Sequence, residues 1–354
     1  MAERELLERL TLAAGAPGAE DEVRAIVRDT LAEIGTISYD KLGSILCEKK
    51  GLSDAPRVVL DAHMDEVAFL VQSVLTDGFL RFVTLGGWWP HVLLGHRVDV
   101  VTANGKIPGV IGSKPPHFLT AEERKKVLKI EDMYIDVGAR SVKDAERLGI
   151  ALGDPIVPRG VFEEMADADL LTSKAFDDRA GIGVMCEVLR GLTGDHPSTV
   201  IGVGTVQEEV GIRGAGTAAE LARPDVAIAL ECTGADDIPG FDVRQAVLGD
   251  GPQIRVFDPT ALFNRKLVRL ATDVARENGI THQMAVRRTG GTDAARIERH
   301  ATGVPTVVIS VPARYIHSHT SVISWKDYVG TVDLVKALVG RLDAETVAGL
   351  TDFS

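Results

Sequence analysis

Histidine and carboxylate side chains recur along this chain in short motifs, each beside an apolar stretch typical of a β-strand. The residues that could bind a divalent metal are His63 in DAHMDE, Asp177 in SKAFDDR, Glu208 and Glu209 in TVQEEVG, Glu231 in ALECTG and His317 in RYIHS. Side chains at strand ends can converge on one point in open α/β enzymes. Two imidazoles with several carboxylates suit a pair of Zn²⁺, Co²⁺ or Mn²⁺ ions. The sequence therefore predicts a two-metal hydrolase.

The motif HMDE places a carboxylate two residues after a histidine. In a strand, His63 and Asp65 point to the same face, because side chains alternate with a period of two. Asp65 can then accept a hydrogen bond from the ring nitrogen of His63 that does not bind metal, which fixes the tautomer. A surface His–Asp pair is the alternative, but the position directly after the apolar run VVLDA favours a ligand.

Two adjacent aspartates, Asp177 and Asp178, precede a helix that we expect to begin near Arg179. A carboxylate at this place can bridge two cations about 3.5–4 Å apart. An aspartate before a first helical turn can also cap the helix. One aspartate can bridge metals while the other caps, and the sequence leaves open which does which.

Glu208 and Glu209 follow the apolar strand STVIGVGTV. Two glutamates that end a buried strand are costly unless positive charge compensates them. If the strand continues through them, their side chains point to opposite faces, so one can hold metal while the other moves protons. A solvated pair in a loop is the alternative interpretation.

Two more motifs and one turn complete the candidate site. Glu231 ends the strand VAIAL, and His317 follows VVISVPARYI, with His319 as a competing imidazole two residues later. The turn GGTDA could cap a helix or present backbone amides to a substrate. Its candidate substrate-binding residues are Gly291, Thr292 and Asp293.

The alternation of helices and apolar strands predicts an α/β/α sandwich for residues 1–67 and 159–354. Residues 68–158 have a different texture, because short strands alternate there with Gly, Asn or Asp turns. We therefore expect a small β-rich domain, a barrel or a PDZ-like fold, inserted into the sandwich. The only convincing helices in this insert are expected at AEERKKVLKI (residues 121–130) and SVKDAERLG (residues 141–149).

Composition limits the partners and the compartment. The formal net charge of −12 argues against nucleic acid as a main partner, because phosphate binding needs clustered Lys and Arg. No uncharged run approaches the length of a membrane span, and the start of the chain resembles an amphipathic helix rather than a signal peptide. The three cysteines are odd in number and far apart, which is typical of reduced thiols in the cytoplasm.

The order and context of the motifs resemble the tetrahedral aminopeptidase (TET) family of dinuclear metallo-aminopeptidases, some of which carry glutamyl aminopeptidase or endoglucanase labels. The segments that carry the resemblance are HMDE, GSKPPH, SKAFDDR, QEEVG, GGTDA and RYIHS. The resemblance covers nearly the whole chain, including the insert, and implies a sandwich of the zinc-peptidase type.

The resemblance also implies a role for each residue. Asp177 would bridge two ions, with His63 and Glu231 completing one site. Glu209 and His317 would complete the other. The implied general base is Glu208, and Asp65 is implied as the partner of His63. Many relatives have Asp in place of Glu231 and Pro in place of His319.

We expect a metal-dependent aminopeptidase that removes N-terminal residues from peptides. Another two-metal amidase, such as a deacylase or carboxypeptidase, is the alternative, and a blocked α-amine would distinguish them. A binding or scaffold protein is disfavoured because every implied ligand and the base are present. The resemblance further implies that the insert mediates dimers and that six dimers build a hollow dodecamer. The loop Lys114–Lys129 could then gate an active site.

Overall fold

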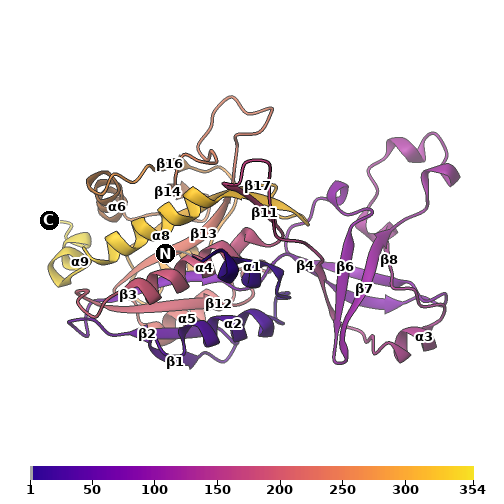
Figure 1. The fold of residues 1–354 in the computed structure, drawn as a ribbon, viewed down its shortest axis with the longest axis horizontal. Helices are drawn as coiled ribbons and strands as arrows, with labels where there is room; N and C mark the ends of the chain where they lie inside the picture. Colours follow the sequence, from indigo (N-terminus) through magenta and orange to yellow (C-terminus); the bar gives the residue numbers. More distant parts are fainter. Residues whose placement is uncertain (1–2) are drawn as a thin grey trace.

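Two bodies of secondary structure make up residues 3–354 in this computed structural model: a large mixed sheet covered by helices, and a smaller closed β-barrel (Figure 1). The first body consists of α1 (Arg4–Leu12), α2 (Asp21–Leu31), β1 (Thr36–Tyr39), β2 (Ile45–Lys49), β3 (Arg57–His63), β10 (Glu163–Glu164), β11 (Leu170–Ser173), α4 (Phe176–Gly191), β12 (Thr199–Thr205), α5 (Gly214–Ala222), β13 (Val226–Gly234), β14 (Gln253–Asp258), β15 (Ala261–Leu262), α6 (Arg265–Glu277), β16 (Gln283–Val286), α7 (Ala294–Ile297), β17 (Thr306–Arg314), β18 (Ser321–Ser324), α8 (Trp325–Val339) and α9 (Ala344–Leu350). The barrel consists of β4 (Ala68–Val74), β5 (Leu80–Leu85), β6 (Arg97–Thr102), β7 (Gly105–Gly112), β8 (Tyr134–Asp136) and β9 (Pro155–Pro158), with the helix α3 (Val142–Arg147).

The centre of the large sheet is parallel and its flanks are antiparallel. The strand order β1-β2-β12-β3-β13-β17-β18-β11-β10 places β12, β3, β13 and β17 side by side, all parallel. The strand β14 adds to β17 on a branch that also carries β15 and β16. The carboxyl ends of the four parallel strands therefore lie along one edge of the sheet, where open α/β folds bind ligands.

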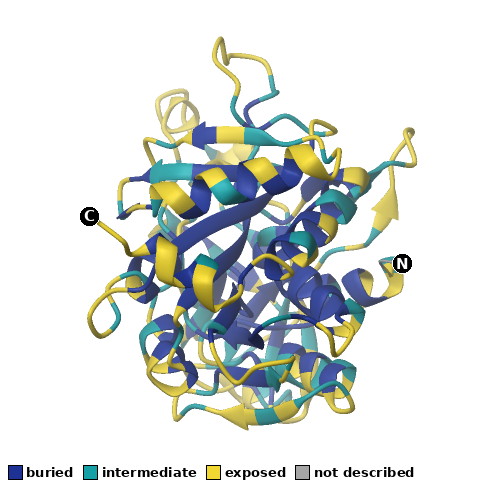
Figure 2. Cartoon of the chain, turned by 90° about the vertical axis from the view of Figure 1, so that its left-hand side faces the viewer, coloured by how far each residue is buried: buried dark blue, intermediate teal, exposed yellow. Residues whose placement is uncertain are grey.

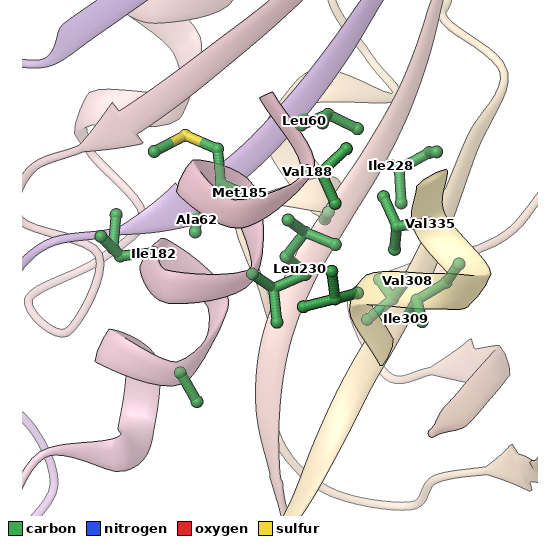
Figure 3. Close-up of a cluster of buried hydrophobic side chains, with 14 of the residues drawn as sticks. Leu60, Ala62, Ile182, Met185, Val188, Ile228, Leu230, Val308, Ile309 and Val335 are labelled. Carbon is green, nitrogen blue, oxygen red and sulfur yellow. The ribbon is translucent and has the colours of Figure 1, made fainter. Parts of the chain in front are cut away.

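Side-chain alternation in the strands explains why helices cover both faces of this sheet. Leu60 and Ala62 of β3 pack in the larger core, which the helices α1, α2, α4, α6 and α8 share, whereas Val59 packs with α5 on the opposite face. Figure 3 shows Leu60, Ala62 and Leu230 meeting side chains of α4. Burying a Leu side chain stabilises a fold by about 1.5–3 kcal/mol. Buried residues accordingly fill the strands and the helix faces that lie against them (Figure 2). The predicted α/β/α sandwich is confirmed.

The barrel closes in the strand order β4-β5-β8-β7-β6-β9, so the barrel alternative is confirmed over the PDZ-like one. Its core holds Phe69, with its ring centroid 5.1 Å from that of Phe82 and 4.7 Å from that of Trp88. Phe82 also lies in this core, and Trp88 packs against it. Trp89 and Phe118 are exceptions, with 63% and 71% of their surfaces exposed.

The expected helix at residues 121–130 is wrong. This segment holds only the 3-10 turn Glu123–Lys125 and the start of a second at Ile130–Asp132, and most of its side chains are exposed. Only Leu128 and Ile130, at its end, pack against the barrel core, and the charged run before them has no such packing. A short helix with so little packing is unstable in water. The second expected helix in the insert is confirmed as α3.

Among the described residues, no helix combines the length and the apolar character needed to cross a membrane.

Candidate active site

All six predicted ligand and base residues line one pocket of about 480 Å³ at the carboxyl edge of the parallel strands. His63 is the last residue of β3, Glu208 and Glu209 follow β12, and His317 follows β17. One placement differs from expectation, because Glu231 lies inside β13, which runs on to Gly234. Asp177 lies at the start of α4, before its regular turns, as expected.

Asp177 stands at the centre of the cluster. Its Oδ1 lies 3.3 Å from Nε2 of His63, and its Oδ2 lies 3.5 Å from Nε2 of His317. The same nitrogen of His317 lies 3.6 Å from Oε2 of Glu209. The two oxygens of one carboxylate therefore face two different imidazoles, which is the arrangement of a bridging ligand.

The neighbouring Asp178 has a different environment. Its Oδ1 accepts the backbone N–H of Gly181 at 3.1 Å, which caps the first regular turn of α4. Its Oδ2 accepts the backbone N–H of His63 at 3.2 Å, so it also ties α4 to the end of β3. Of the two aspartates, Asp178 makes the capping contacts and Asp177 faces the imidazoles.

The loop after β12 holds both glutamates against the cluster. The strand ends at Thr205, so Glu208 and Glu209 do not alternate as they would in a continuing strand, and both line the pocket. The carboxylate of Asp65 accepts the backbone N–H of Glu208 at 2.9 Å and that of Glu209 at 3.0 Å. Asp65 thereby fixes the backbone from which both side chains extend.

The contact between Asp65 and His63 is different from the one expected. Nδ1 of His63 lies 3.1 Å from the backbone carbonyl of Asp65 and 3.6 Å from its carboxylate. The chain has left the strand after His63, so the side chain of Asp65 reaches the glutamate loop, and its carbonyl faces the ring. Either contact leaves Nε2 as the nitrogen that points to Asp177.

The barrel contributes to the site through one loop. Nδ1 of His317 lies 2.8 Å from the backbone carbonyl of Gly87, between β5 and β6, which orients the ring and leaves Nε2 free for a metal. A Cβ at the neighbouring Gly86 would lie 3.1 Å from Oε2 of Glu209. The competing imidazole, His319, does not line the pocket; it stacks on His96 of the barrel, with ring centroids 4.1 Å apart.

Burial dominates the electrostatics of the cluster. It raises the pKa of Glu209 to about 7 and raises the pKa of Glu208 and of Glu231 well above the ordinary range. Burial lowers the pKa of His317, but its hydrogen bond with Asp177 and the charge of Glu209 outweigh this and raise it to about 10. Carboxylates that are this buried need positive charge close by.

The donor set fits divalent metal. Ligand atoms of His63, Asp177 and Glu209 all lie within 4.8 Å of one another, and so do those of His63, Asp178 and Glu231. Within residues 3–354, none of these carboxylates forms an ion pair with Lys or Arg. Imidazole and carboxylate donors around a shared carboxylate suit Zn²⁺, Co²⁺ or Mn²⁺.

The GGTDA turn is only partly in the pocket. Gly291 and Thr292 line it, but Asp293 does not. Asp293 is 1% exposed and accepts a hydrogen bond from the hydroxyl of Thr205, which places it beneath the pocket rather than against a substrate. Burial, with the charge of Asp293 next, raises the pKa of Asp61 in β3 far above its ordinary value. A buried, mainly structural role fits Asp293 better than the predicted substrate contact.

Two pocket residues, Arg255 and Arg287, were missed in the sequence analysis. A signal for Arg255 exists, because a charged residue inside the apolar strand QIRVFD must be paired or functional. Arg287 follows β16 in an exposed-looking basic stretch, and nothing in its local sequence distinguishes it from Arg288.

Comparison with known proteins assigns the chain to a family. The model of the M42 glutamyl aminopeptidase family matches residues 43–334. The chain belongs to this family. It is a metal-dependent aminopeptidase. The family match therefore favours this activity over that of a deacylase or a carboxypeptidase.

Three relatives align with this aminopeptidase over nearly its full length. It is 40% identical to the FrvX protein of Escherichia coli K12, over 99% of this chain and 98% of that protein. It is 35% identical to a glutamyl aminopeptidase of Lactococcus lactis, over 98% of both chains. It is 34% identical to a lysyl aminopeptidase of Pyrococcus furiosus, over 97% of this chain and 98% of that one. Such different names leave the preferred N-terminal residue undecided.

Solved structures agree with the family. A TET aminopeptidase from Thaumarchaeota archaeon SCGC AB-539-E09 superimposes with a TM-score of 0.95 at 43% identity, covering 98% of this chain and 99% of that one. The TET1 peptidase of Pyrococcus horikoshii, described as assembling into a tetrahedron or a large octahedral shell, has a TM-score of 0.86 at 32% identity, covering 96% and 99%. The resemblance to the TET family is therefore confirmed.

Proposed function

We propose that this aminopeptidase holds two divalent ions, Zn²⁺ or Co²⁺ with Mn²⁺ as a further option, between five side chains. His63 and Glu231 would hold one ion, and Glu209 and His317 the other. Asp177 would contribute to both. The observation that carries the proposal is the position of Asp177, whose two oxygens face the two imidazoles at 3.3 and 3.5 Å.

Glu208 is the proposed general base. When bound, the two cations would lower the pKa of water and stabilise negative charge on the substrate carbonyl oxygen. The carboxylate of Glu208 lines the pocket and, within residues 3–354, makes no ion pair. It is free to take a proton from the attacking water and return it to the leaving amine. Asp65 keeps this carboxylate in place by holding its backbone.

The variant Glu208→Gln tests this assignment. It keeps the size of the side chain but cannot accept the proton, so turnover of an aminoacyl p-nitroanilide should fall by about 100-fold or more. Bound metal, measured by elemental analysis, should be unchanged. The exposed Glu220→Gln on α5 is the matched control. Wild-type turnover in the Glu208 variant would exclude this residue as the base.

The substrates are proposed to be peptides with a free N-terminus. Acetylation of the α-amine should abolish cleavage if the site binds that group, as an aminopeptidase must. We also propose the cytoplasm as the compartment, supported by three cysteines that are all buried free thiols.

We propose that the chain assembles through its barrel into dimers and then a dodecamer. Support comes from the described assembly of the Pyrococcus horikoshii relative and from exposed apolar side chains on the insert, Trp89 and Phe118. The loop 114–129, which is mostly exposed, is the proposed gate. Light scattering of the metal-loaded protein should give a mass many times the 37.9 kDa of one chain; a monomer would contradict the assembly.

A further inference from the structure

The loop that carries the proposed ligand His317 has a strained backbone. It spans residues 315–320, between β17 and β18. Tyr315 and His317 have φ angles of 63° and 56°, in the left-handed region that residues other than glycine rarely adopt. Such a conformation persists only where the surrounding structure holds it. The position of the His317 ring therefore depends on what packs against this loop.

His319 lies in the same loop, and its side chain contacts the barrel. It is 3% exposed and does not line the pocket. Its ring stacks on that of His96, with centroids 4.1 Å apart and an angle of 22° between the rings. It also meets the ring of Trp88, with centroids 5.3 Å apart. One buried side chain of the catalytic loop thus touches two aromatic residues of the barrel.

Both of these aromatic residues are anchored in the barrel. The ring of Trp88 stacks on Phe69 in the barrel core, and its Nε1 donates to a backbone carbonyl of β4 at 3.1 Å. The backbone carbonyl of His96 accepts the N–H of Ile111 in β7 at 2.9 Å. His319 therefore packs against two points that the barrel holds in place.

The same stretch of the barrel contacts His317 directly. Gly87, next to Trp88 in the chain, provides the backbone carbonyl that lies 2.8 Å from Nδ1 of His317. Two neighbouring residues of the barrel loop thus meet two residues of the catalytic loop, Gly87 with His317 and Trp88 with His319. Loss of the second contact would let the first one separate.

The ring of His319 acts through its shape rather than through hydrogen bonds. Among residues 3–354, neither of its ring nitrogens has a hydrogen-bond partner, and the nearby backbone of Val92 lies outside hydrogen-bond geometry. A buried polar atom without a partner is unfavourable, whereas stacked aromatic rings attract one another. An aromatic ring without nitrogens should therefore serve the same purpose.

We propose that His319 is a positioning residue for the proposed metal ligand His317. By stacking against the barrel, it keeps the carbonyl of Gly87 on Nδ1 of His317. The other ring nitrogen, Nε2, then stays directed toward Asp177 and Glu209. This inference rests on the proposed two-metal site. It predicts that loss of the His319 ring weakens only the ion that Glu209 and His317 would hold.

Calorimetric titration of chelator-treated protein with Co²⁺ tests the inference without relying on activity. The wild-type protein should bind two ions. In His319→Ala, one ion should bind about 10-fold or more weakly, while the affinity for the other stays within about 3-fold. In His319→Phe, both affinities should stay near those of the wild type. Wild-type binding in the Ala variant, or equal losses in the Ala and Phe variants, would overturn the inference. A third ion that is lost in His319→Phe would make this residue a ligand and overturn it too.

The partner on the barrel gives a second pair of variants. His96→Ala should weaken the same ion, and His96→Phe should not. The matched control is His91→Ala, because His91 lies in the same barrel loop and is exposed, with its ring 4.5 Å from that of Trp89. This control should leave both affinities unchanged. A loss in His91→Ala equal to that in His96→Ala would overturn the inference.

A double variant separates positioning of His317 from general damage to the site. The variant His317→Ala should bind one ion, with His63 and Glu231. Adding His319→Ala should change the affinity for that ion by less than about 3-fold, because the effect of His319 passes through His317. A further loss of about 10-fold or more would show general damage and overturn the inference. Wild-type protein that binds fewer than two ions would overturn the proposed function and this inference together.

Discussion

Asp177 and Asp178 are adjacent in the chain, and the backbone at the start of α4 gives them different partners. Both residues have non-helical backbone angles, which turn their side chains in different directions. Asp178 accepts backbone N–H groups, while Asp177 faces two imidazoles. The residue types alone left open which aspartate would cap and which would bridge, because the choice depends on those backbone angles; only the resemblance to the TET family implied Asp177 as the bridge.

The contacts of Asp65 with the glutamate loop can be tested by substitution. Its two carboxylate oxygens accept the N–H groups of Glu208 and Glu209. In Asp65→Asn one oxygen is replaced by an amide nitrogen that cannot accept, so one of these bonds is lost. We expect kcat to fall by about 10- to 100-fold, with a smaller change in KM. Steady-state kinetics with metal analysis would show this; an unchanged kcat would mean that the glutamate loop holds its position without Asp65.

At the scale of elements, buried charge ties the N-terminal segment to the catalytic loop. Lys174 and Arg179 both contact Glu66, and all three are nearly fully buried. The carboxylate of Glu20, between α1 and α2, accepts the backbone N–H of Gln207 at 3.2 Å. These contacts join segments more than a hundred residues apart, so no local pattern in the sequence could reveal them.

The raised pKa of Glu20 predicts that the stability of the fold depends on pH. Burial raises its pKa from 4.5 to about 7, and the charge of Asp65 adds to this. In the unfolded chain Glu20 loses its proton near pH 4.5, whereas in the folded chain it keeps the proton up to about pH 7. Its contribution to stability is therefore full below pH 4.5 and is lost as the pH rises through about 7.

Thermal unfolding of Glu20→Gln measures this effect. The amide can still accept from Gln207 but carries no charge at any pH. The unfolding temperature of the variant, relative to wild type, should therefore rise between about pH 5 and pH 8. A difference that stays constant, or that falls over this range, would contradict the assigned pKa.

Much of the element order could be predicted because it follows local patterns. The amphipathic start of the chain forms α1, and the apolar runs before His63, Glu208 and Glu231 lie in β3, β12 and β13. The helix predicted at residues 121–130 does not form, because residues 121–127 are exposed and helix propensity alone does not hold a short helix. Arg287 was missed because its partner, Asp236, is brought to it by strand pairing rather than by sequence distance.

At the scale of the whole molecule, the barrel and the sandwich meet at the active site. The Gly87 carbonyl orients His317, and Gly86 packs against Val67 and Glu209. Gly86 has a φ of 83°, where glycine is favoured, and a Cβ there would lie 2.7 Å from Cγ1 of Val67. The barrel is thus part of the site's structure, whatever its role in assembly.

The pair Gly86→Ala and Gly95→Ala tests this contact. Gly95 also has a positive φ, of 80°, but a Cβ there would meet nothing within 4 Å. Both variants should lose about 1–3 kcal/mol of stability from backbone strain. Only Gly86→Ala should also lose activity, by about 10-fold or more, because it displaces Glu209. Equal activities in the two variants would show that the barrel loop does not position the site.

We propose that the cluster around Asp177 makes this aminopeptidase a two-metal enzyme. The most direct measurement is a titration of chelator-treated protein with Co²⁺, following hydrolysis of an aminoacyl p-nitroanilide and the bound metal together. Activity should be absent at first and should stop rising at two bound ions per chain. Full activity in protein with no bound ion, or a plateau at one ion per chain, would contradict the claim.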